Sequence, residues 1–305
     1  MRVLLATPAS AVRLFGMVPL AWALRTAGHE VWIAGPPGFA ATINSTGFVA
    51  VDDSTGISTG ISTGVASLWR PHLVIWDAPA PTTIDGAASV RFLGPFDEAP
   101  PIDGATLDCL PPSLRDGDVP AGFVPMRFVP YTGPAVIPST LRREPRRPRI
   151  YVSLNDADAL SRLFTAAARS RVELVCDARV PPGVRLPANV RLLDPVPVTA
   201  VLPTCTAVIH DGAPYTTMAA LAHGLPQLVP PGEDARRVGG CLVADVTDFE
   251  RLLTDTEVRA GAERLRAEIE AMPSPREVVA DLVRMTDCGV PRPARIGVGA
   301  ACDGQ

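Results

Sequence analysis

The sequence predicts an α/β protein built on two parallel sheets, one in each half of the chain. Apolar runs of strand length alternate with helix-length segments from residue 3 onward, and the same alternation starts again at residue 150. A Pro- and Arg-rich stretch, residues 133–149, separates the two halves. Strand–helix–strand alternation is typical of parallel sheets with right-handed crossovers. Its restart after such a linker indicates two domains.

The first half contains one expected helix and four expected strands. The helix covers residues 16–27 and ends at Gly28, because glycine readily takes the left-handed conformation that closes a helix. Residues 54–65 hold three copies of a Ser-Thr-Gly-Ile repeat, with Val in the last copy, and predict a flexible loop. Residues 94–122 are dense in Pro, Asp and Gly and show little periodicity. The expected strands are residues 3–6, 31–34, 73–76 and 90–93.

The second half repeats the alternation. Its expected helix covers residues 157–170, its C-terminus is expected to be helical, and its first strands are expected at residues 150–154, 172–175 and 190–193.

Residues 208–227, VIHDGAPYTTMAALAHGLPQ, are the most informative stretch. An apolar strand is followed by a turn of small and polar residues and by a helix that Gly224 ends. Either Thr216 or Thr217 is the expected N-cap of that helix. Such a turn collects free backbone N–H groups and the positive end of the helix dipole, which suits a phosphate. The alternative interpretation is one more strand–helix unit of an open sheet.

Composition excludes several classes of protein. A net charge of −4 gives no electrostatic case for binding nucleic acid or an anionic membrane, and no apolar run reaches the length of a membrane span. The six cysteines are scattered without a Cys-x-x-Cys pair, which indicates neither a disulfide framework nor a zinc site. All 28 basic residues are arginine, so the chain has no Schiff-base lysine and no P-loop. We expect a cytoplasmic protein.

Four stretches resemble the GT-B glycosyltransferases that attach deoxysugars to macrolide and polyketide antibiotics. Residues 208–227 resemble the donor-binding signature, in which two His precede Gly-Gly-Ala-Gly-Thr and a helix ends in His-Gly-Val-Pro-Gln. The other three stretches are the opening residues 1–51, the interdomain residues 124–134 and the helix entry at residues 271–279.

The resemblance implies two Rossmann-like domains that face each other across a cleft. The N-terminal, acceptor-type domain is expected to be reduced, because residues 94–122 stand where the family has several helices of the acceptor pocket. The implied divisions are an N-terminal domain (1–132), a linker (133–149), a nucleotide-sugar-binding domain (150–287) and a disordered tail (288–305).

The resemblance also implies the donor-binding residues. The loop departs from the family pattern, because Asp211 replaces the second His, Pro214 removes a backbone N–H and Tyr215 adds bulk. These changes are expected to weaken the donor site without abolishing it. The positions that match the family are Ser153, Val196, His210, Gly212, Thr216 and Thr217.

The catalytic base is the second departure. Arg13 occupies the position of the family's usual His, and arginine stays protonated, so it cannot accept a proton. Asp77 is the tentative substitute, because it ends an expected strand and open sheets bind ligands at the carboxyl ends of their strands. The alternative is a polar residue that merely closes a strand. The remaining histidines, His29, His72 and His223, are expected to have no catalytic role.

Two functions follow from the resemblance and its departures. One is transfer of a deoxysugar from an NDP-sugar of the dTDP type to an aglycone hydroxyl, with inversion, no metal and no cofactor. The other is a catalytically degenerate binding or scaffold protein, or a partner of an active glycosyltransferase. A GT-B epimerase is disfavoured because the carboxylate-rich site is missing. The expected ligands are a nucleotide sugar and a polyketide-type aglycone, and the expected partners are another glycosyltransferase or a second copy.

Overall fold

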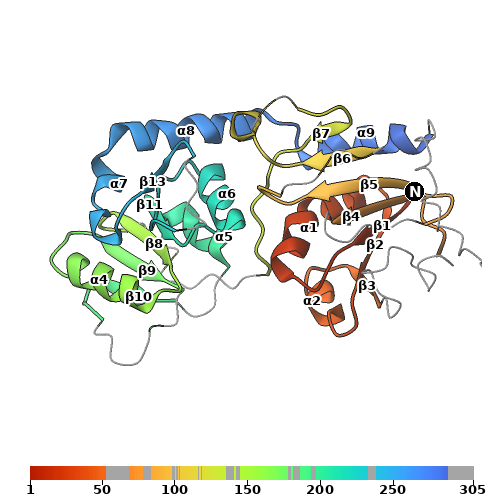
Figure 1. The fold of residues 1–305 in the computed structure, drawn as a ribbon. Helices are drawn as coiled ribbons and strands as arrows, with labels where there is room; N and C mark the ends of the chain where they lie inside the picture. The colour runs from red at the N-terminus through yellow and green to blue at the C-terminus, as the bar shows by residue number, and fades with distance from the viewer. Residues whose placement is uncertain are drawn as a thin grey trace, which may run out of the picture.

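The computed structural model shows two lobes, each built on a parallel sheet (Figure 1). The predicted repeat loop at residues 54–65, and the predicted tail, lie outside the residues that the structure describes. The described residues are 1–52, 69–77, 84–97, 100, 102, 104–115, 117, 119–134, 141, 145–177, 180, 186–193, 197–232 and 238–287.

The first lobe holds a seven-stranded sheet in the order β3-β2-β1-β4-β5-β6-β7, and every neighbouring pair is parallel. Its central strands are short, apolar and buried on both faces, as expected for a parallel sheet. The strands are β1 (Arg2–Ala6), β2 (Glu30–Gly35), β3 (Val49–Asp52), β4 (Leu73–Asp77), β5 (Ala88–Leu93), β6 (Ala105–Asp108) and β7 (Phe123–Pro125).

Helix α1 (Ala11–Thr26) begins five residues before the predicted start at residue 16. Ser10 is its N-cap, and the Ser10 side chain accepts a hydrogen bond from the backbone N–H of Arg13 at 3.5 Å. Gly28 takes a positive φ of 87° just after the helix, as predicted. The earlier start places Arg13 in the first turn of α1, beside the carboxyl ends of the strands. A short helix, α2 (Ala40–Ser45), connects β2 to β3.

The second lobe holds a six-stranded parallel sheet in the order β10-β9-β8-β11-β12-β13. Its strands are β8 (Arg149–Ser153), β9 (Glu173–Cys176), β10 (Val190–Leu192), β11 (Ala207–His210), β12 (Gln227–Val229) and β13 (Cys241–Val243). Its helices and helical turns are α4 (Ala157–Ala167), α5 (Val198–Val201), η3 (Leu202–Thr204), α6 (Pro214–Ala222), η4 (Val246–Asp248), α7 (Arg251–Thr254) and α8 (Thr256–Ala271).

The last helix, α9 (Pro275–Asp287), returns to the first lobe (Figure 1). It packs against α1, and Val278 and Leu282 are fully buried in the same apolar cluster as the buried side chains of α1. The backbone N–H of Arg127 donates to the carbonyl of Pro273 at 2.7 Å where α9 begins. The predicted domain limits place α9 with the second domain, but in space it covers the first sheet.

Three strands of the first lobe were not predicted: β3, β6 and β7. Residues 94–122, which show little periodicity, contain β6 and a single turn of 3-10 helix, η2 (Pro112–Leu114), and β7 follows directly. Parallel neighbours are usually joined through a helix. In the described part of the connection from β5 to β6, residues 94–104, there is none. The N-terminal domain is therefore reduced, as expected: the described residues between β5 and β6 form no helix.

The two faces of the first sheet are covered differently. The helices α1 and α9 cover one face. On the other face the buried side chains of β1, β2 and β4 pack against Trp69, which is helical, and against Ile84 and Ile102, which lie in loops. Trp32 and Trp69 stack there, with ring centroids 4.1 Å apart. None of the helices in the described ranges has both the length and the hydropathy of a transmembrane span.

Candidate functional site

The side chain of Arg13 joins two aspartates where α1 begins. Its Nε and Nη2 donate to the two carboxylate oxygens of Asp77, at 2.6 and 2.7 Å. Its Nη2 and Nη1 also donate to Asp97, at 2.5 and 3.3 Å. Asp97 accepts a further hydrogen bond from the backbone N–H of Gly94 at 2.9 Å, just after β5. One guanidinium therefore serves two carboxylates; we call these three side chains the Arg13 cluster.

The Arg13 cluster is partly withdrawn from solvent. The side chain of Asp77 is 2% exposed, and those of Arg13 and Asp97 are 22% and 24% exposed. Burial of the guanidinium disfavours its charge, but the hydrogen bonds and charges of Asp77 and Asp97 prevail and raise the pKa of Arg13. Arg13 is therefore a permanent cation here. Asp77 does end its strand as predicted, and both of its oxygens accept from Arg13.

Tyr215 reaches from α6 in the second lobe to the first lobe. A Cβ placed on Gly16 would lie only 2.6 Å from the Tyr215 hydroxyl oxygen, and one on Gly94 would lie 3.1 Å from it. The ring of Phe128 lies 6.1 Å from the Tyr215 ring, centroid to centroid. Burial and the nearby charge of Asp77 raise the pKa of Tyr215, so the phenol stays protonated. The bulk of Tyr215 thus points toward the first lobe and the Arg13 cluster.

His210 is fully buried at the end of β11. Its Nε2 lies 2.7 Å from Gln227 Oε1, and its Nδ1 accepts from the backbone N–H of Gly212 at 3.1 Å. Burial lowers the pKa of His210, so the ring is neutral, with the proton assigned to Nε2 by these partners. His210 therefore fixes the position of Gly212 in the donor loop, which is the turn at residues 211–213 between β11 and α6. Its predicted contact with a diphosphate stays a prediction, as does that of Gly212.

The predicted N-cap of α6 was wrong. The N-cap is Ala213, which makes no side-chain capping bond, and Pro214 is the first helical residue. Proline suits this position because its fixed φ fits the helix and no N–H is required there. Thr217 lies inside the first turns, with its N–H and its hydroxyl both bonded to the carbonyl of Ala213. Thr216 is half-buried, and the termination at Gly224, with a φ of 66°, was predicted correctly.

Two acidic side chains, Asp177 and Asp211, follow the carboxyl ends of β9 and β11 and accept hydrogen bonds from residues at or just after the end of β8. The Ser153 hydroxyl donates to Asp177 at 3.4 Å, and Tyr151 donates to the same carboxylate. Asn155 donates to Asp211, the residue that replaces the family's second His. Two carboxylates near the expected diphosphate position disfavour an anion by direct repulsion. Val196, the remaining predicted donor residue, lies outside the described residues.

The other histidines occupy structural positions. His29 Nδ1 lies 3.2 Å from the N-terminal amino group, and His72 Nδ1 accepts from the backbone N–H of Arg2 at 3.0 Å. His223 is the C-cap of α6, where its backbone N–H bonds to carbonyls of the last turn. Among the described residues, no group of three His, Cys, Asp or Glu side chains could hold a metal ion.

Asp97 was not identified from the sequence. It lies 84 positions from Arg13 along the chain, so no local pattern links them. The only local signal is the Gly-Pro-Phe-Asp turn, in which an aspartate bonds back to the N–H of Gly94.

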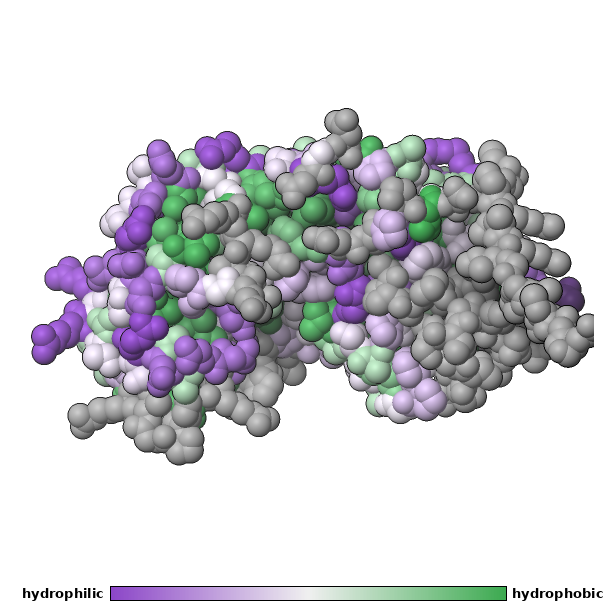
Figure 2. All heavy atoms as spheres, viewed as in Figure 1, coloured by the Kyte–Doolittle hydropathy of each residue, from purple (hydrophilic) through white to green (hydrophobic). Residues whose placement is uncertain are grey.

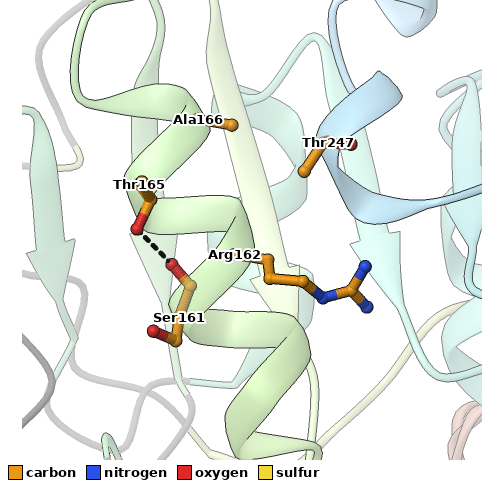
Figure 3. A pocket seen from close by; sticks show the side chains of 5 residues that line it. All are labelled: Ser161, Arg162, Thr165, Ala166 and Thr247. Atoms are coloured by element: carbon orange, nitrogen blue, oxygen red, sulfur yellow. Dashed lines mark hydrogen bonds between the residues drawn. The ribbon is translucent and has the colours of Figure 1, made fainter.

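Two features of the surface bear on where ligands bind. The space-filling view is indented between the two lobes, on the lower side of Figure 2. A separate shallow depression lies between α4 and η4 (Figure 3). Arg162, which lines it, pairs with Asp245. The depression lies away from the strand ends that carry the predicted site residues, so we do not take it as the functional site. It is lined by Ser161, Arg162, Thr165, Ala166 and Thr247.

Family models match a part of each half of the chain. The model described as "Erythromycin biosynthesis protein CIII-like, N-terminal domain" matches residues 93–155. The corresponding C-terminal domain model matches residues 161–247.

Curated relatives are deoxysugar transferases by name. The aclacinomycin-T 2-deoxy-L-fucose transferase of Streptomyces galilaeus is 28% identical over 424 aligned positions, covering 94% of this chain and 96% of that protein. The 3-alpha-mycarosylerythronolide B desosaminyl transferase of Saccharopolyspora erythraea is 28% identical, with 92% and 97% covered. Because 424 positions exceed the 305 residues of this chain, the first alignment contains long gaps on this side.

Solved structures share the fold. The glycosyltransferase SnogD from Streptomyces nogalater is 30% identical with a TM-score of 0.79, covering 94% of this chain and 99% of that chain. The glycosyltransferase VinC, solved in complex with dTDP, is 26% identical with a TM-score of 0.77, covering 95% and 100%. The two lobes are therefore the two domains of a GT-B fold, and the chain belongs to the family of glycosyltransferases that transfer deoxysugars in macrolide and polyketide antibiotic biosynthesis.

Proposed function

We propose that this chain is a nucleotide-sugar-binding member of the family that does not transfer sugar efficiently by itself. The observation that carries the proposal is the bond between Arg13 and both oxygens of Asp77. Attack by an acceptor hydroxyl needs a group that takes up its proton, and such a base contributes about 10²–10⁴-fold to the rate. Arg13 is a fixed cation, and Asp77, the substitute base, is occupied by it.

Tyr215 supports the same proposal. Its hydroxyl lies against Gly16 and Gly94, on the side of the first lobe where the Arg13 cluster stands. A side chain of this size takes up space between the donor loop and the first lobe. Donor and acceptor must meet across that space in a two-domain transferase.

The donor side is better preserved. The parallel strand β11, the loop held by His210 and the start of α6, which has no side-chain cap, form an arrangement that suits a phosphate. The acidic Asp177 and Asp211 oppose it. We therefore propose weak binding of dTDP or a dTDP-sugar at the second domain, with Ser153, Gly212, Thr216 and Thr217 at the diphosphate and Val196 beside the base. His210 is fully buried and both of its ring nitrogens are bonded, so we propose that it acts there by supporting Gly212.

The second candidate function is transfer itself, from a dTDP-deoxysugar to a hydroxyl of a polyketide-type aglycone with inversion. The names of the relatives favour it. It would require Arg13 to leave Asp77 so that Asp77 could act as the base. If the chain does not catalyse transfer, its role would be that of a binding or scaffold protein, paired with an active glycosyltransferase or with a second copy.

Calorimetry with dTDP and a turnover assay for dTDP release test the two candidates together. The proposal expects measurable dTDP binding and no turnover above the uncatalysed rate, for the protein alone and for Arg13→His. Fast turnover by the unmodified protein would contradict the proposal and assign transfer to this chain. Robust turnover by Arg13→His would show that only the base was lost and that the acceptor pocket is intact. No dTDP binding at all would refute the donor-site assignment.

A further inference from the structure

Arg91 is a buried arginine on the face of the first sheet opposite α1. It lies in β5, between Trp76 of β4 and Thr106 of β6, and Thr106 is opposite Phe123 of the edge strand β7. Paired residues of parallel strands point to the same face, so these four side chains form one row. Trp76 belongs to the apolar cluster on the face away from α1. Arg91 is only 2% exposed, so its charge is almost fully removed from solvent.

Only part of the Arg91 guanidinium is satisfied. Its Nη1 donates to the carbonyl of Pro100 at 2.7 Å, and its Cζ lies 6.0 Å from the centroid of the Phe123 ring. Its Nε and Nη2 are buried and have no hydrogen-bond partner among the described residues. A buried donor without a partner is costly, and for a charged group the cost is larger. This arginine therefore lacks a partner that the chemistry of its site requires.

The local charge balance points to an anion. Arg115 stacks on the same Phe123 ring, with its Cζ 5.0 Å from the centroid, and pairs with Asp108. The described residues here supply two guanidinium groups and one carboxylate. Burial lowers the pKa of Arg91 and of Arg115, as expected where desolvation is incompletely compensated.

The two free donors have the geometry of a carboxylate site. The Nε–H and Nη2–H of arginine point the same way and together match the two oxygens of a carboxylate. Arg13 uses the same pair of nitrogens on Asp77 in this molecule, at 2.6 and 2.7 Å. We propose that the Nε and Nη2 of Arg91 form a binding subsite for the carboxylate of a small organic acid. The subsite is independent of the nucleotide-sugar site, because it lies on the face of the first sheet away from α1.

The test uses the full chain labelled with ¹⁵N at arginine, with acetate as the probe and chloride at matched ionic strength as the control. The Arg91 Nε–H signal, assigned by its loss in Arg91→Lys, is expected to shift with acetate in a saturable manner. The Nε–H signal of Arg2 is the internal control, because its Nε and Nη2 already donate to the carbonyl of Arg70. It is expected not to move.

A stability measurement distinguishes the effect of the paired Nε–H and Nη2–H donors of Arg91 from the effect of its positive charge. Acetate, but not chloride, is expected to raise the midpoint of thermal unfolding of the wild type. Arg91→Lys keeps the charge but loses the paired donors, so acetate binding is expected to weaken about tenfold or more. Arg2→Lys is expected to respond to acetate as the wild type does.

Two outcomes overturn the proposal. The first is the absence of any saturable shift of the Arg91 signal. The second is a signal that is already at a carboxylate-paired position without acetate and that moves only when an acidic residue of this chain is replaced. Substitution of Glu98, Asp103, Asp116 and Asp118 by their amides tests the second outcome, which would make Arg91 part of an internal ion pair.

Discussion

Replacing Arg13 by methionine is expected to destabilise the protein by about 2–4 kcal/mol. The substitution leaves Asp77 and Asp97 as two like charges that shared one cation. Removing one partner of a fully buried ion pair costs about 3–5 kcal/mol. The expected value is lower because Arg13 and Asp97 remain 22% and 24% exposed, so solvent screens part of the interaction. Most of the cost is expected to come from Asp77, whose side chain is 2% exposed.

Urea unfolding at pH 7 measures this loss as a lower midpoint at an unchanged m-value. Arg162→Met is the matched control, because it removes the same kind of side chain from an ion pair with Asp245. That pair is 52% and 43% exposed, so solvent screens it and its loss is expected to cost much less than the loss of Arg13. Equal losses in the two variants would refute the view that the Arg13 cluster holds the first lobe together.

Removing the charge of Asp77, which has lost its partner in Arg13→Met, provides a second check. Adding Asp77→Asn to Arg13→Met is expected to recover part of the lost stability, because an amide is less costly to bury than an unpaired charge. A double variant that is less stable by the sum of the two single losses would show that the charges do not interact.

Three further predictions concern His210 in the second lobe and the contact of Tyr215 with Gly16 between the lobes. His210→Ala is expected to weaken dTDP binding by about 1–3 kcal/mol in calorimetry, because Gly212 loses its support, and unchanged affinity contradicts the assignment. Because burial lowers the pKa of His210, the unfolded chain takes up the proton first as the pH falls below about 6.5. Stability is then lost with falling pH at up to about 1.4 kcal/mol per pH unit, and His210→Asn is expected to remove that part of the slope in urea titrations from pH 7 to 5. Gly16→Ala is expected to cost about 1–3 kcal/mol, because the new methyl would lie 2.6 Å from the Tyr215 hydroxyl. In a Tyr215→Ala background the same change is expected to be neutral or to stabilise by up to about 1 kcal/mol, because alanine favours the helix.

The sequence was most informative where a residue's environment depends on its neighbours along the chain. The buried strands β1, β4 and β8 follow from apolar runs, and the ends of α1 and α6 follow from Gly28 and Gly224. Capping was harder to assign. The predicted N-cap of α6 was Thr216 or Thr217, but Pro214 is the first helical residue and the N-cap is Ala213. Helix α1 was predicted to begin at Gly16, but its N-cap is Ser10.

Contacts distant in sequence could not be predicted. Tyr215 was expected to obstruct the phosphate, but its hydroxyl instead lies beside Gly16 and Gly94, about 200 and 120 positions earlier in the chain. The same holds for Asp97, which pairs with Arg13 only because β5 ends beside the start of α1. The roles predicted for Asp77 and for the donor residues remain predictions, because the positions of these residues do not test them.

The departures from the family pattern lie in two lobes but meet at one place. Arg13 belongs to the first lobe and Tyr215 to the second, yet the Tyr215 hydroxyl reaches Gly94, whose N–H is bonded to Asp97 of the Arg13 cluster. Reverting Arg13 to His would free Asp77 and Asp97 to orient an imidazole, but the Tyr215 ring would still lie against Gly16 and Gly94. Restoring the base and clearing the space between the lobes are therefore separate requirements. A single substitution is expected to meet only one of them, which is why Arg13→His alone should not restore transfer.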